Sequence, residues 1–401
     1  MGTIDTSERM PLHRAVYHAL RTVRLRNNGV ETMTPYIVSS PGAGKTKLII
    51  DEITKMKDFA IMACTPGLQR LEEFGGIPDI FKVSVIIDGN TIEELHTKWS
   101  VPEIISKARD LANSHKFVVV LLDDWHICGP EIQCIGFELF THHSLSGHKI
   151  PNNVSFILAG NETSTAGAQE QLSAIVNRCI VIKSLADFNY WVKNFALPNK
   201  LHPLGISFLQ HSIYNHFFME DERDSPYGSP RSWTTLFNHL TDIELNEPKI
   251  NMSELLCIFS GCVGPTAAQD FLNYYMISSK INAKEIFKTG SWKLPMEDLS
   301  KYVFIHSVVI EYYNLFCKCS EDKNKALFKN YSNIFSDIIK YLFENESAIF
   351  LAGFNFLVSF PEDKKYNVKS GMKLVSDLCS NKYLPKEVFE KYLPMVGSDK
   401  V

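Results

Sequence analysis

The residues with the clearest chemical potential form a glycine-containing turn near the N-terminus. The run Ser39-Ser-Pro-Gly-Ala-Gly-Lys45-Thr46 fits the pattern G-x-x-x-x-G-K-[ST], with a serine in place of the first glycine. An apolar segment, Tyr36-Ile-Val-Ser-Ser, precedes the turn, and residues 45–57 have helical spacing. Backbone N–H groups and the positive end of a helix dipole would then face an anion. The sequence therefore predicts a phosphate-binding loop between a strand and a helix.

Each side chain of this loop has an expected role in binding a nucleotide. Gly42 and Gly44 let the backbone turn around the phosphates, while Lys45 reaches the β and γ phosphates and Thr46 ligates magnesium. The predicted cofactors are thus ATP and Mg²⁺. A chance glycine turn is the alternative, and the strand–turn–helix context argues against it. The predicted nucleotide-binding residues are Ser40, Pro41, Gly42, Ala43, Gly44, Lys45, Thr46 and Lys47.

A second chemical signal lies further along the chain, where an apolar strand ends in two carboxylates. The run Phe117-Val-Val-Val-Leu-Leu-Asp123-Asp124 has the form of a Walker B strand. Asp123 is expected in the magnesium shell, and Asp124 is expected to be the general base that polarises an attacking water. Most ATPases of this architecture carry the longer glutamate at the second place, and a base displaced by about 1 Å can lower the rate about 10²-fold. Slow hydrolysis, or a switch that mainly binds ATP, therefore stays open.

Short apolar strands alternate with helical stretches around these residues. Strands are expected at residues 59–64, 117–122, 154–159 and 179–182, and a helix at 102–114. The alternation predicts a parallel sheet covered by helices. The Asp88-Gly-Asn90 turn lies between two strand-like runs and predicts a hairpin inserted at about residues 80–100. Residues 1–185 are therefore expected to form an α/β nucleotide-binding core.

Helices are also predicted before the first strand of this core and after its last strand. Residues 9–27 have helical spacing with interspersed arginines, which favours an amphipathic surface helix and leaves a nucleic-acid arm as the alternative. After about residue 184 the strand signals fade, and helices are expected at 187–196, 204–218, 232–242 and 269–277. We expect an α-helical lid over residues 186–278 and a helical C-terminal extension over 279–401.

The motif order resembles that of a MoxR-like AAA+ ATPase of the helix-2-insert group, over roughly residues 33–275. The run Gly75-Gly-Ile-Pro78 is similar to the family's Gly-Ile-Pro turn, and the predicted hairpin falls near the helix-2 insert. The runs Ile132-Gln-Cys-Ile-Gly-Phe-Glu-Leu and Gly147-His-Lys-Ile-Pro151 match the segments that precede the sensor 1 strand. The resemblance implies an AAA+ P-loop core whose hairpin points towards a central pore.

Three further site residues follow from this resemblance alone. Asn161 ends the run Val154-Ser-Phe-Ile-Leu-Ala-Gly-Asn161 and takes the place of sensor 1, which holds the attacking water and senses the γ phosphate. Arg178, in Leu172-Ser-Ala-Ile-Val-Asn-Arg178, takes the place of an arginine finger that enters a neighbouring subunit's site, although a structural role at the sheet edge stays open. Arg231, in Ser229-Pro-Arg231-Ser-Trp233, takes the place of sensor 2 in the lid.

The function implied by this resemblance is that of a magnesium-dependent ATP hydrolase that forms a ring, a hexamer, and remodels or assembles a protein partner. The family resemblance suggests a partner with a von Willebrand factor A domain. Two alternatives stay open: a nucleic-acid loader or motor, and a nucleotide-gated switch with weak hydrolysis. The absence of a clear basic stripe or helix-turn-helix motif counts against the nucleic-acid alternative.

Composition sets the remaining bounds on function. The 401 residues carry a net charge of −4, so any binding to nucleic acid or an anionic membrane must be local. Nine cysteines without a repeated CxxC framework fit a reducing compartment, and we expect the protein to be cytoplasmic. No signal-peptide pattern or membrane-length apolar run is present in this sequence, so we expect neither secretion nor membrane insertion. His126 is expected to pack or hydrogen-bond in the loop after the Walker B-like strand.

Overall fold

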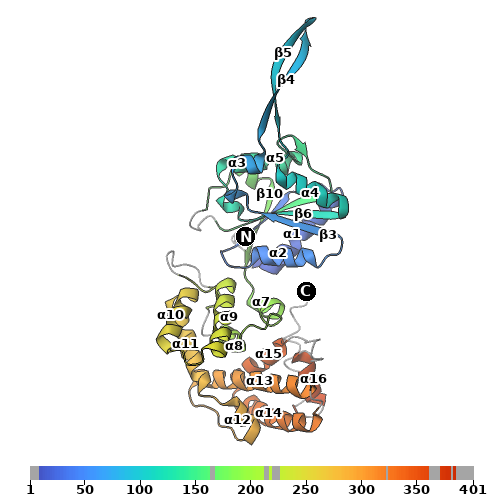
Figure 1. Cartoon of the computed structure of the whole chain (residues 1–401). Coiled ribbons are helices and arrows are strands. Elements are labelled where there is room, and N and C mark those ends of the chain that lie inside the picture. The colour runs from blue at the N-terminus through green and yellow to red at the C-terminus, as the bar shows by residue number, and fades with distance from the viewer. Residues whose placement is uncertain are drawn as a thin grey trace, which may run out of the picture. The chain divides into compact units, whose positions relative to one another are not determined.

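The computed structural model describes residues 9–162, 168–211, 216–218, 226–321, 324–360, 371–380, 383 and 384. The chain divides into two units, Met1–Asp187 and Phe188–Val401. The first unit is α/β, and the described part of the second is helical (Figure 1). This confirms the predicted fold class, an α/β core with a parallel sheet followed by a helical region. The predicted division of the helical region into a lid and an extension stays a prediction.

A parallel sheet of six strands forms the centre of the first unit. Its order is β1 (Met10–Pro11), β10 (Cys179–Leu185), β2 (Thr34–Val38), β9 (Val154–Gly160), β6 (Phe117–Leu122) and β3 (Phe59–Cys64). Every neighbouring pair is parallel. All residues of β2 and β9 are buried. Strands that are covered on both faces need continuous apolar sequence, which accounts for the run of valines and leucines in β6.

Helices cover this sheet on both sides. Helix α1 (Leu12–Asn27) contacts β2, β9 and β10, and α2 (Lys45–Thr54) contacts β3. Helices α4 (Glu103–Ser114) and α5 (Pro130–His142) lie across the sheet from α1 and α2 (Figure 1). The alternation of side chains along β6 directs Val118, Val120 and Leu122 towards α4 and α5, where they share one core with these helices.

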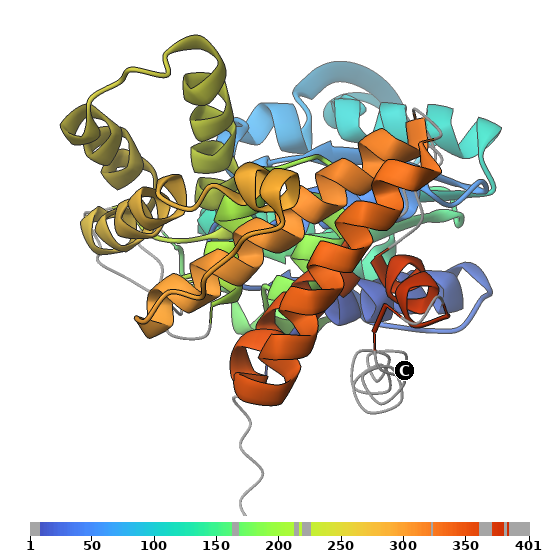
Figure 2. The same cartoon turned by 90° about the horizontal axis from the view of Figure 1, so that it is seen from below.

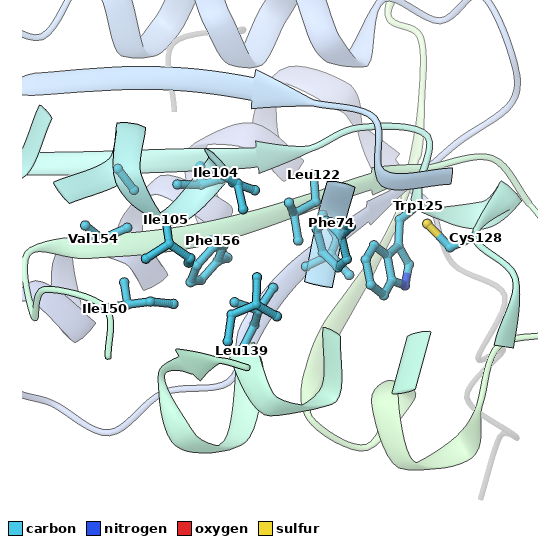
Figure 3. Close-up of a cluster of buried hydrophobic side chains, with 14 of the residues drawn as sticks. Phe74, Ile104, Ile105, Leu122, Trp125, Cys128, Leu139, Ile150, Val154 and Phe156 are labelled. Carbon is cyan, nitrogen blue, oxygen red and sulfur yellow. The ribbon is translucent and has the colours of Figure 1, made fainter. Parts of the chain in front are cut away.

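Trp125 fixes the turn that follows β6 to this core. Its side chain is fully buried beside Phe74 and Cys128 (Figure 3). Its ring meets that of Phe140 edge-on, with centroids 5.6 Å apart. A Cβ at Gly136 of α5 would lie 2.5 Å from the tryptophan ring, so only glycine leaves room for it there. The short helical turn η2 (Trp125–Ile127) is therefore held by packing from inside the core.

The hairpin predicted at about residues 80–100 is present over residues 78–99. Strands β4 (Pro78–Ile87) and β5 (Asn90–Trp99) pair antiparallel along their whole length around the Asp88-Gly89 turn and extend away from the sheet of their own unit (Figure 1). At its base, the Ser100 N–H donates to the Ile77 carbonyl at 2.8 Å, and the Ile77 N–H donates to Ser100 Oγ at 2.8 Å. Large apolar side chains are exposed along both strands: Ile80, Phe81, Ile86, Ile87, Ile92, Leu95 and Trp99.

Smaller elements complete the described part of the first unit. They are η1 (Pro66–Leu68), α3 (Leu71–Gly75), a short pair β7 (Ser144–Leu145) and β8 (His148–Lys149), and α6 (Ser173–Val176).

Several predicted boundaries differ from those of the structure. The helix expected over residues 9–27 begins at Leu12, because Met10–Pro11 pair with β10 instead. The helix expected over 45–57 ends at Thr54. The helix expected over 204–218 ends at Gln210, after which His211 is extended; residues 212–215 of that prediction lie outside the described residues. Helical spacing of apolar residues thus gave the existence of these helices and not their ends.

The second unit packs its helices around aromatic side chains. Phe208 of α8, Trp233 of α9 and Phe271 of α11 meet with ring centroids 5.1–6.0 Å apart. Helices α13 and α14 pack side by side, and α15 contacts both (Figure 2). Among the described residues, no helix combines the length and apolar character needed to cross a membrane. The elements are α7 (Phe188–Trp191), η3 (Val192–Ala196), α8 (Pro203–Gln210), α9 (Pro230–Asn246), α10 (Met252–Val263), α11 (Pro265–Ser279), α12 (Ala283–Thr289), α13 (Asp298–Glu321), α14 (Lys325–Asn345), α15 (Ser347–Ser359) and α16 (Gly371–Ser380).

Candidate functional site

The glycine turn lies where β2 ends and α2 begins. Gly42 has φ 79°, and Gly44, the residue that caps the N-terminus of α2, has φ 91°. Both are left-handed conformations that favour glycine, which explains why the pattern requires glycine at these places. The turn therefore has the backbone form that lets N–H groups converge on an anion in front of a helix N-terminus.

Lys45 is the most enclosed charged group of this site. Only 6% of the residue is exposed, and its ammonium group donates to the Ser39 carbonyl at 3.1 Å, Ser39 Oγ at 3.2 Å and the Ser40 carbonyl at 3.2 Å. A fourth and shorter contact, 2.8 Å, reaches Oδ1 of Asn161 beyond β9. These four acceptors are uncharged oxygens. A phosphate oxygen in the place of one of them would form a stronger, charge-assisted hydrogen bond with the ammonium.

Thr46 and Asp123 form the second contact of the site. The threonine hydroxyl donates to Asp123 Oδ2 at 2.7 Å, which joins the start of α2 to the end of β6. The backbone N–H of Asp123 donates to the Cys64 carbonyl at 2.8 Å and so fixes the carboxylate against β3. Burial, with the Asp123 charge as a second cause, raises the pKa of the Cys64 thiol to about 12, so this sulfur stays protonated. A hydroxyl and a carboxylate oxygen at one point are ligands that Mg²⁺ accepts.

Asp124 differs from Asp123 in both exposure and backbone conformation. Its side chain is 49% exposed, and its backbone is left-handed with φ 49° and ψ 37°. Aspartate enters this region more readily than most residues, at a cost of about 1 kcal/mol. The buried Trp125 next to it fixes the turn. Asp124 is therefore held beside the site with its carboxylate in reach of solvent, as a general base requires.

His126 joins these residues, whereas its sequence position favoured a packing or hydrogen-bonding role in the loop. Its ring is buried; Nε2 lies 2.9 Å from Nδ2 of Asn161, and Nδ1 lies 3.9 Å from Oδ1 of Asp124. Burial is the largest cause that lowers the pKa of His126, and the Lys45 charge adds to it against the opposite effect of Asp124 and Asp123. The imidazole is therefore neutral at pH 7. Its place two residues after the candidate base is the sequence signal for this contact.

Arg178 is engaged within its own unit. Its Nε donates to Thr141 Oγ1 at 2.9 Å, its Nη1 donates to the Ala174 carbonyl at 2.9 Å, and the guanidinium lies 4.1 Å from the centroid of the Phe137 ring. These contacts connect Arg178, the residue before β10, to α5 and α6. The structural role at the sheet edge that the sequence left open stays an alternative. A role as a finger in a neighbouring subunit stays a prediction.

Arg231 lies in the second unit, in the first turn of α9. The side chain of Ser229 caps this helix by accepting from the Ser232 N–H at 3.2 Å, and the buried Trp233 donates through Nε1 to the His216 carbonyl at 2.8 Å. The serine and the tryptophan of the Ser-Pro-Arg-Ser-Trp motif are thus explained by capping and packing, whereas Arg231 is exposed. Its role as sensor 2 stays a prediction.

The structure thus brings together Lys45, Thr46, Asp123 and Asn161 directly, and Asp124 through His126. The contacts of Arg178 do not include any of these residues.

Comparisons with known proteins find distant structural similarity. No protein-family model matches the sequence, and no curated protein matches it. Among solved structures, the RuvB Holliday junction branch migration motor of Thermotoga maritima is similar at 13% identity and a TM-score of 0.33, over 69% of this chain and 74% of that one. NtrX of Brucella abortus in complex with ADP is similar at 11% identity and a TM-score of 0.34, over 94% of this chain and 69% of that one. Likeness at this level carries no inference about activity, which the site residues must supply.

Proposed function

We propose that this chain is a magnesium-dependent ATPase of the AAA+ type. The observation that carries the proposal is the meeting of three separate segments on the glycine turn: α2 through Lys45 and Thr46, the end of β6 through Asp123, and the residue after β9 through Asn161. Together they supply the side chains that phosphoryl transfer needs. Helix α2 supplies a cation and a hydroxyl, the end of β6 supplies a carboxylate, and the residue after β9 supplies a neutral amide.

The side chains of this site have distinct tasks in hydrolysis. Lys45 exchanges its uncharged acceptors for phosphate oxygens and stabilises the charge that develops on them. Thr46 and Asp123 hold the magnesium ion, which when bound supplies Lewis-acid stabilisation of the phosphate charge. Asn161 hydrogen-bonds the attacking water or the terminal phosphate through its amide. Asp124 accepts the proton of that water from the solvent-exposed side of the site.

Two separate lysine substitutions test this assignment, one in α2 and one at the residue that follows it. Lys45→Ala removes the buried ammonium, and we expect ATP turnover to fall below about 1% of the parent rate. The control is Lys55→Ala, which removes an exposed lysine near the end of the same helix whose contact is a surface ion pair with Glu52, and which should leave turnover unchanged. Equal turnover of Lys45→Ala and the parent protein would exclude the proposed site.

The second candidate function is a nucleotide-gated binding protein with weak hydrolysis. It is favoured by Asp124, because the shorter carboxylate stands where a glutamate reaches further and lies 3.9 Å from His126 rather than in a hydrogen bond. Asp124→Glu distinguishes the two candidates. A rise in turnover of about tenfold or more at unchanged ATP affinity favours the switch, whereas fast turnover of the parent protein removes it.

The proposal extends to assembly into a homo-oligomeric ring, by the resemblance a hexamer of MoxR-like type, that remodels or assembles a protein partner. The resemblance supports a von Willebrand factor A domain as that partner. The β4–β5 hairpin supports a protein contact, because a two-stranded hairpin with apolar residues on it is marginal alone and gains stability when it is covered. Mass photometry with and without ATP, beside turnover at increasing protein concentration, tests assembly. Turnover per chain that is independent of concentration, in a protein that stays monomeric with ATP, would contradict the ring.

A further inference from the structure

His126 lies between the two side chains that the proposed reaction needs near the attacking water. Its Nε2 is 2.9 Å from Nδ2 of Asn161, and its Nδ1 is 3.9 Å from Oδ1 of Asp124. The residue is 5% exposed, so the ring is packed inside the turn. Nδ1 is buried and forms no hydrogen bond among the described residues, and the Asp124 carboxylate is the charged group that faces it.

The partners of Asn161 determine how this ring is protonated. An ammonium group has donors and no acceptor, so Lys45 requires that Asn161 present its carbonyl oxygen, Oδ1. The amide nitrogen of Asn161 must then face His126 and donate to Nε2. Nε2 therefore carries no proton, and the single proton of the neutral ring is on Nδ1, directed at Asp124. Lys45, Asn161 and His126 thus form one chain of donors and acceptors with a defined direction, and its last N–H faces Asp124 Oδ1 across 3.9 Å.

The backbone of His126 is fixed independently of its ring. The neighbouring Trp125 is fully buried, and the His126 carbonyl accepts from the Gln169 N–H at 2.7 Å. The buried Gln133 extends this attachment, since its side chain bonds the carbonyls of Cys128 and Glu170 and the N–H of Leu172. A ring mounted on such a turn can orient the side chains that touch it.

We propose that His126 is a positioning residue for ATP hydrolysis, which holds the Asn161 carboxamide in one orientation and, through its Nδ1 proton, draws the Asp124 carboxylate to the attacking water. This rests on the proposed function. When Lys45 turns to a phosphate, Oδ1 of Asn161 is released while its nitrogen stays bound to His126. The amide nitrogen has a second hydrogen, which it can donate to a phosphate oxygen or to water. Binding of the terminal phosphate therefore changes the hydrogen bonding of Asn161 and, through His126, the position of the Asp124 carboxylate.

The test compares five variants in turnover and in affinity for ATP and ADP. His126→Leu removes both ring nitrogens and should lower kcat at least tenfold, with ATP affinity within about threefold of the parent. His126→Gln keeps an oxygen that can accept from Asn161 and should recover part of the loss. His115→Leu, which removes a histidine outside the site, is the control and should keep the parent rate. The double variant His126→Leu/Asn161→Ala should lose less than the product of the two single losses, because part of the effect of His126 is exerted through Asn161.

The outcomes separate this proposal from the proposed function. If the parent turns over ATP and His126→Leu does so equally well, or if the losses of His126→Leu and Asn161→Ala simply multiply, the positioning role is wrong while the ATPase stands. If the parent binds ATP without turnover, the ATPase proposal fails, and the ratio of ATP to ADP affinity decides: a ratio about two- to threefold closer to one in His126→Leu supports the phosphate relay, and an unchanged ratio overturns it. If the parent binds neither nucleotide, both proposals fail. Thermal unfolding of each variant verifies that it folds.

Discussion

Two buried polar networks, one in each unit, use similar residues in different ways. In the α/β unit, Lys45, Asn161 and His126 are linked at 2.8 and 2.9 Å and lead towards the half-exposed Asp124. In the helical unit, Ser207 Oγ, Tyr274 OH and His306 Nδ1 are linked at 3.0 Å each, and all three residues are fully buried. The first network contains a cation and ends beside a carboxylate that water can reach.

The second network ends among rings and helices. The His306 ring lies 5.0 Å from that of Phe356, and the Ser207 hydroxyl donates to the Leu204 carbonyl at 2.8 Å within α8. Burial lowers the pKa of His306 to about 3, and His211 nearby adds to the effect. The difference teaches that a buried histidine is not in itself a functional signal. What distinguishes His126 is a chain of hydrogen bonds from a cation towards a solvent-accessible carboxylate.

The largest effect on turnover is expected for substitution of Asp124, the solvent-accessible carboxylate beside the first network. Asp124→Asn removes the proton acceptor and keeps the shape, so turnover should fall about 10²–10⁴-fold while ATP affinity changes little. Steady-state hydrolysis with a nucleotide titration measures both. A variant that retains the parent rate would place the base elsewhere and would remove the functional distinction between the two networks.

Acid should weaken the second network without involving catalysis. His306 has a pKa near 6.5 when unfolded and about 3 when folded, so between these values the unfolded chain binds a proton that the folded chain does not. Its contribution to stability is complete above pH 6.5 and declines by about 1.4 kcal/mol per pH unit as the pH falls. Pulse proteolysis in urea between pH 7.5 and 5, followed on fragments that contain α13, measures this. The slope should become shallower in His306→Gln, and equal slopes would refute the assignment.

Gly136→Ala examines how far the first network depends on its hydrophobic support. A Cβ there would lie 2.5 Å from the Trp125 ring, so the ring must shift, at a cost of about 1–3 kcal/mol. Because Trp125 fixes the turn with Asp124 and His126, turnover should fall several-fold in protein that remains folded. Thermal unfolding and hydrolysis are measured together, with Gly261→Ala as a control, since a Cβ at Gly261 meets nothing within 4 Å. If Gly136→Ala lowers the stability of the protein but leaves its turnover unchanged, the turn tolerates movement of Trp125.

The smallest effect is expected for Tyr274→Phe. It deletes the hydroxyl that joins Ser207 to His306 and leaves the ring in place, so the free energy of unfolding should fall by about 1–3 kcal/mol. Turnover at a temperature where the variant is folded should equal that of the parent. Reduced turnover in this folded variant would mean that the second network also influences the site, against the distinction drawn here.

The sequence predicted the parts of the site that depend on local rules. Gly42 and Gly44 occur because positive φ is required in front of α2, and β6 reads as a buried strand because both of its faces are covered. The hairpin followed from its Asp-Gly turn. These features need only a few neighbouring residues, so a single sequence contains them.

Features that depend on contacts between distant segments were less accessible. The position of His126 two residues after Asp124 places it near the site but does not distinguish it from a packing histidine. Its contact with Asn161, 35 positions away, is seen only in the structure, where Nδ2 of Asn161 lies 2.9 Å from Nε2 of the ring. The strand of Met10–Pro11 exists because β10 is beside it, and the helix predicted over residues 204–218 ends early although its apolar spacing continues. Helical spacing reports which residues favour burial, whereas helix ends depend on what the chain meets in space.

The base of the hairpin has a consequence for how this protein diversifies and how it can be engineered. Ile77 and Ser100 bond each other at the point where the two strands leave the core, and a Cβ at Gly76 would lie 2.5 Å from the Ser100 carbonyl oxygen, so this junction is tight and specific. Because Ile77 and Ser100, the residues on either side of the hairpin, are hydrogen-bonded to each other, their position in the core does not depend on the segment between them. We therefore expect residues 79–98 to be exchangeable: shortening or replacing them, or fusing a reporter domain there, should leave the contacts of the nucleotide site in place.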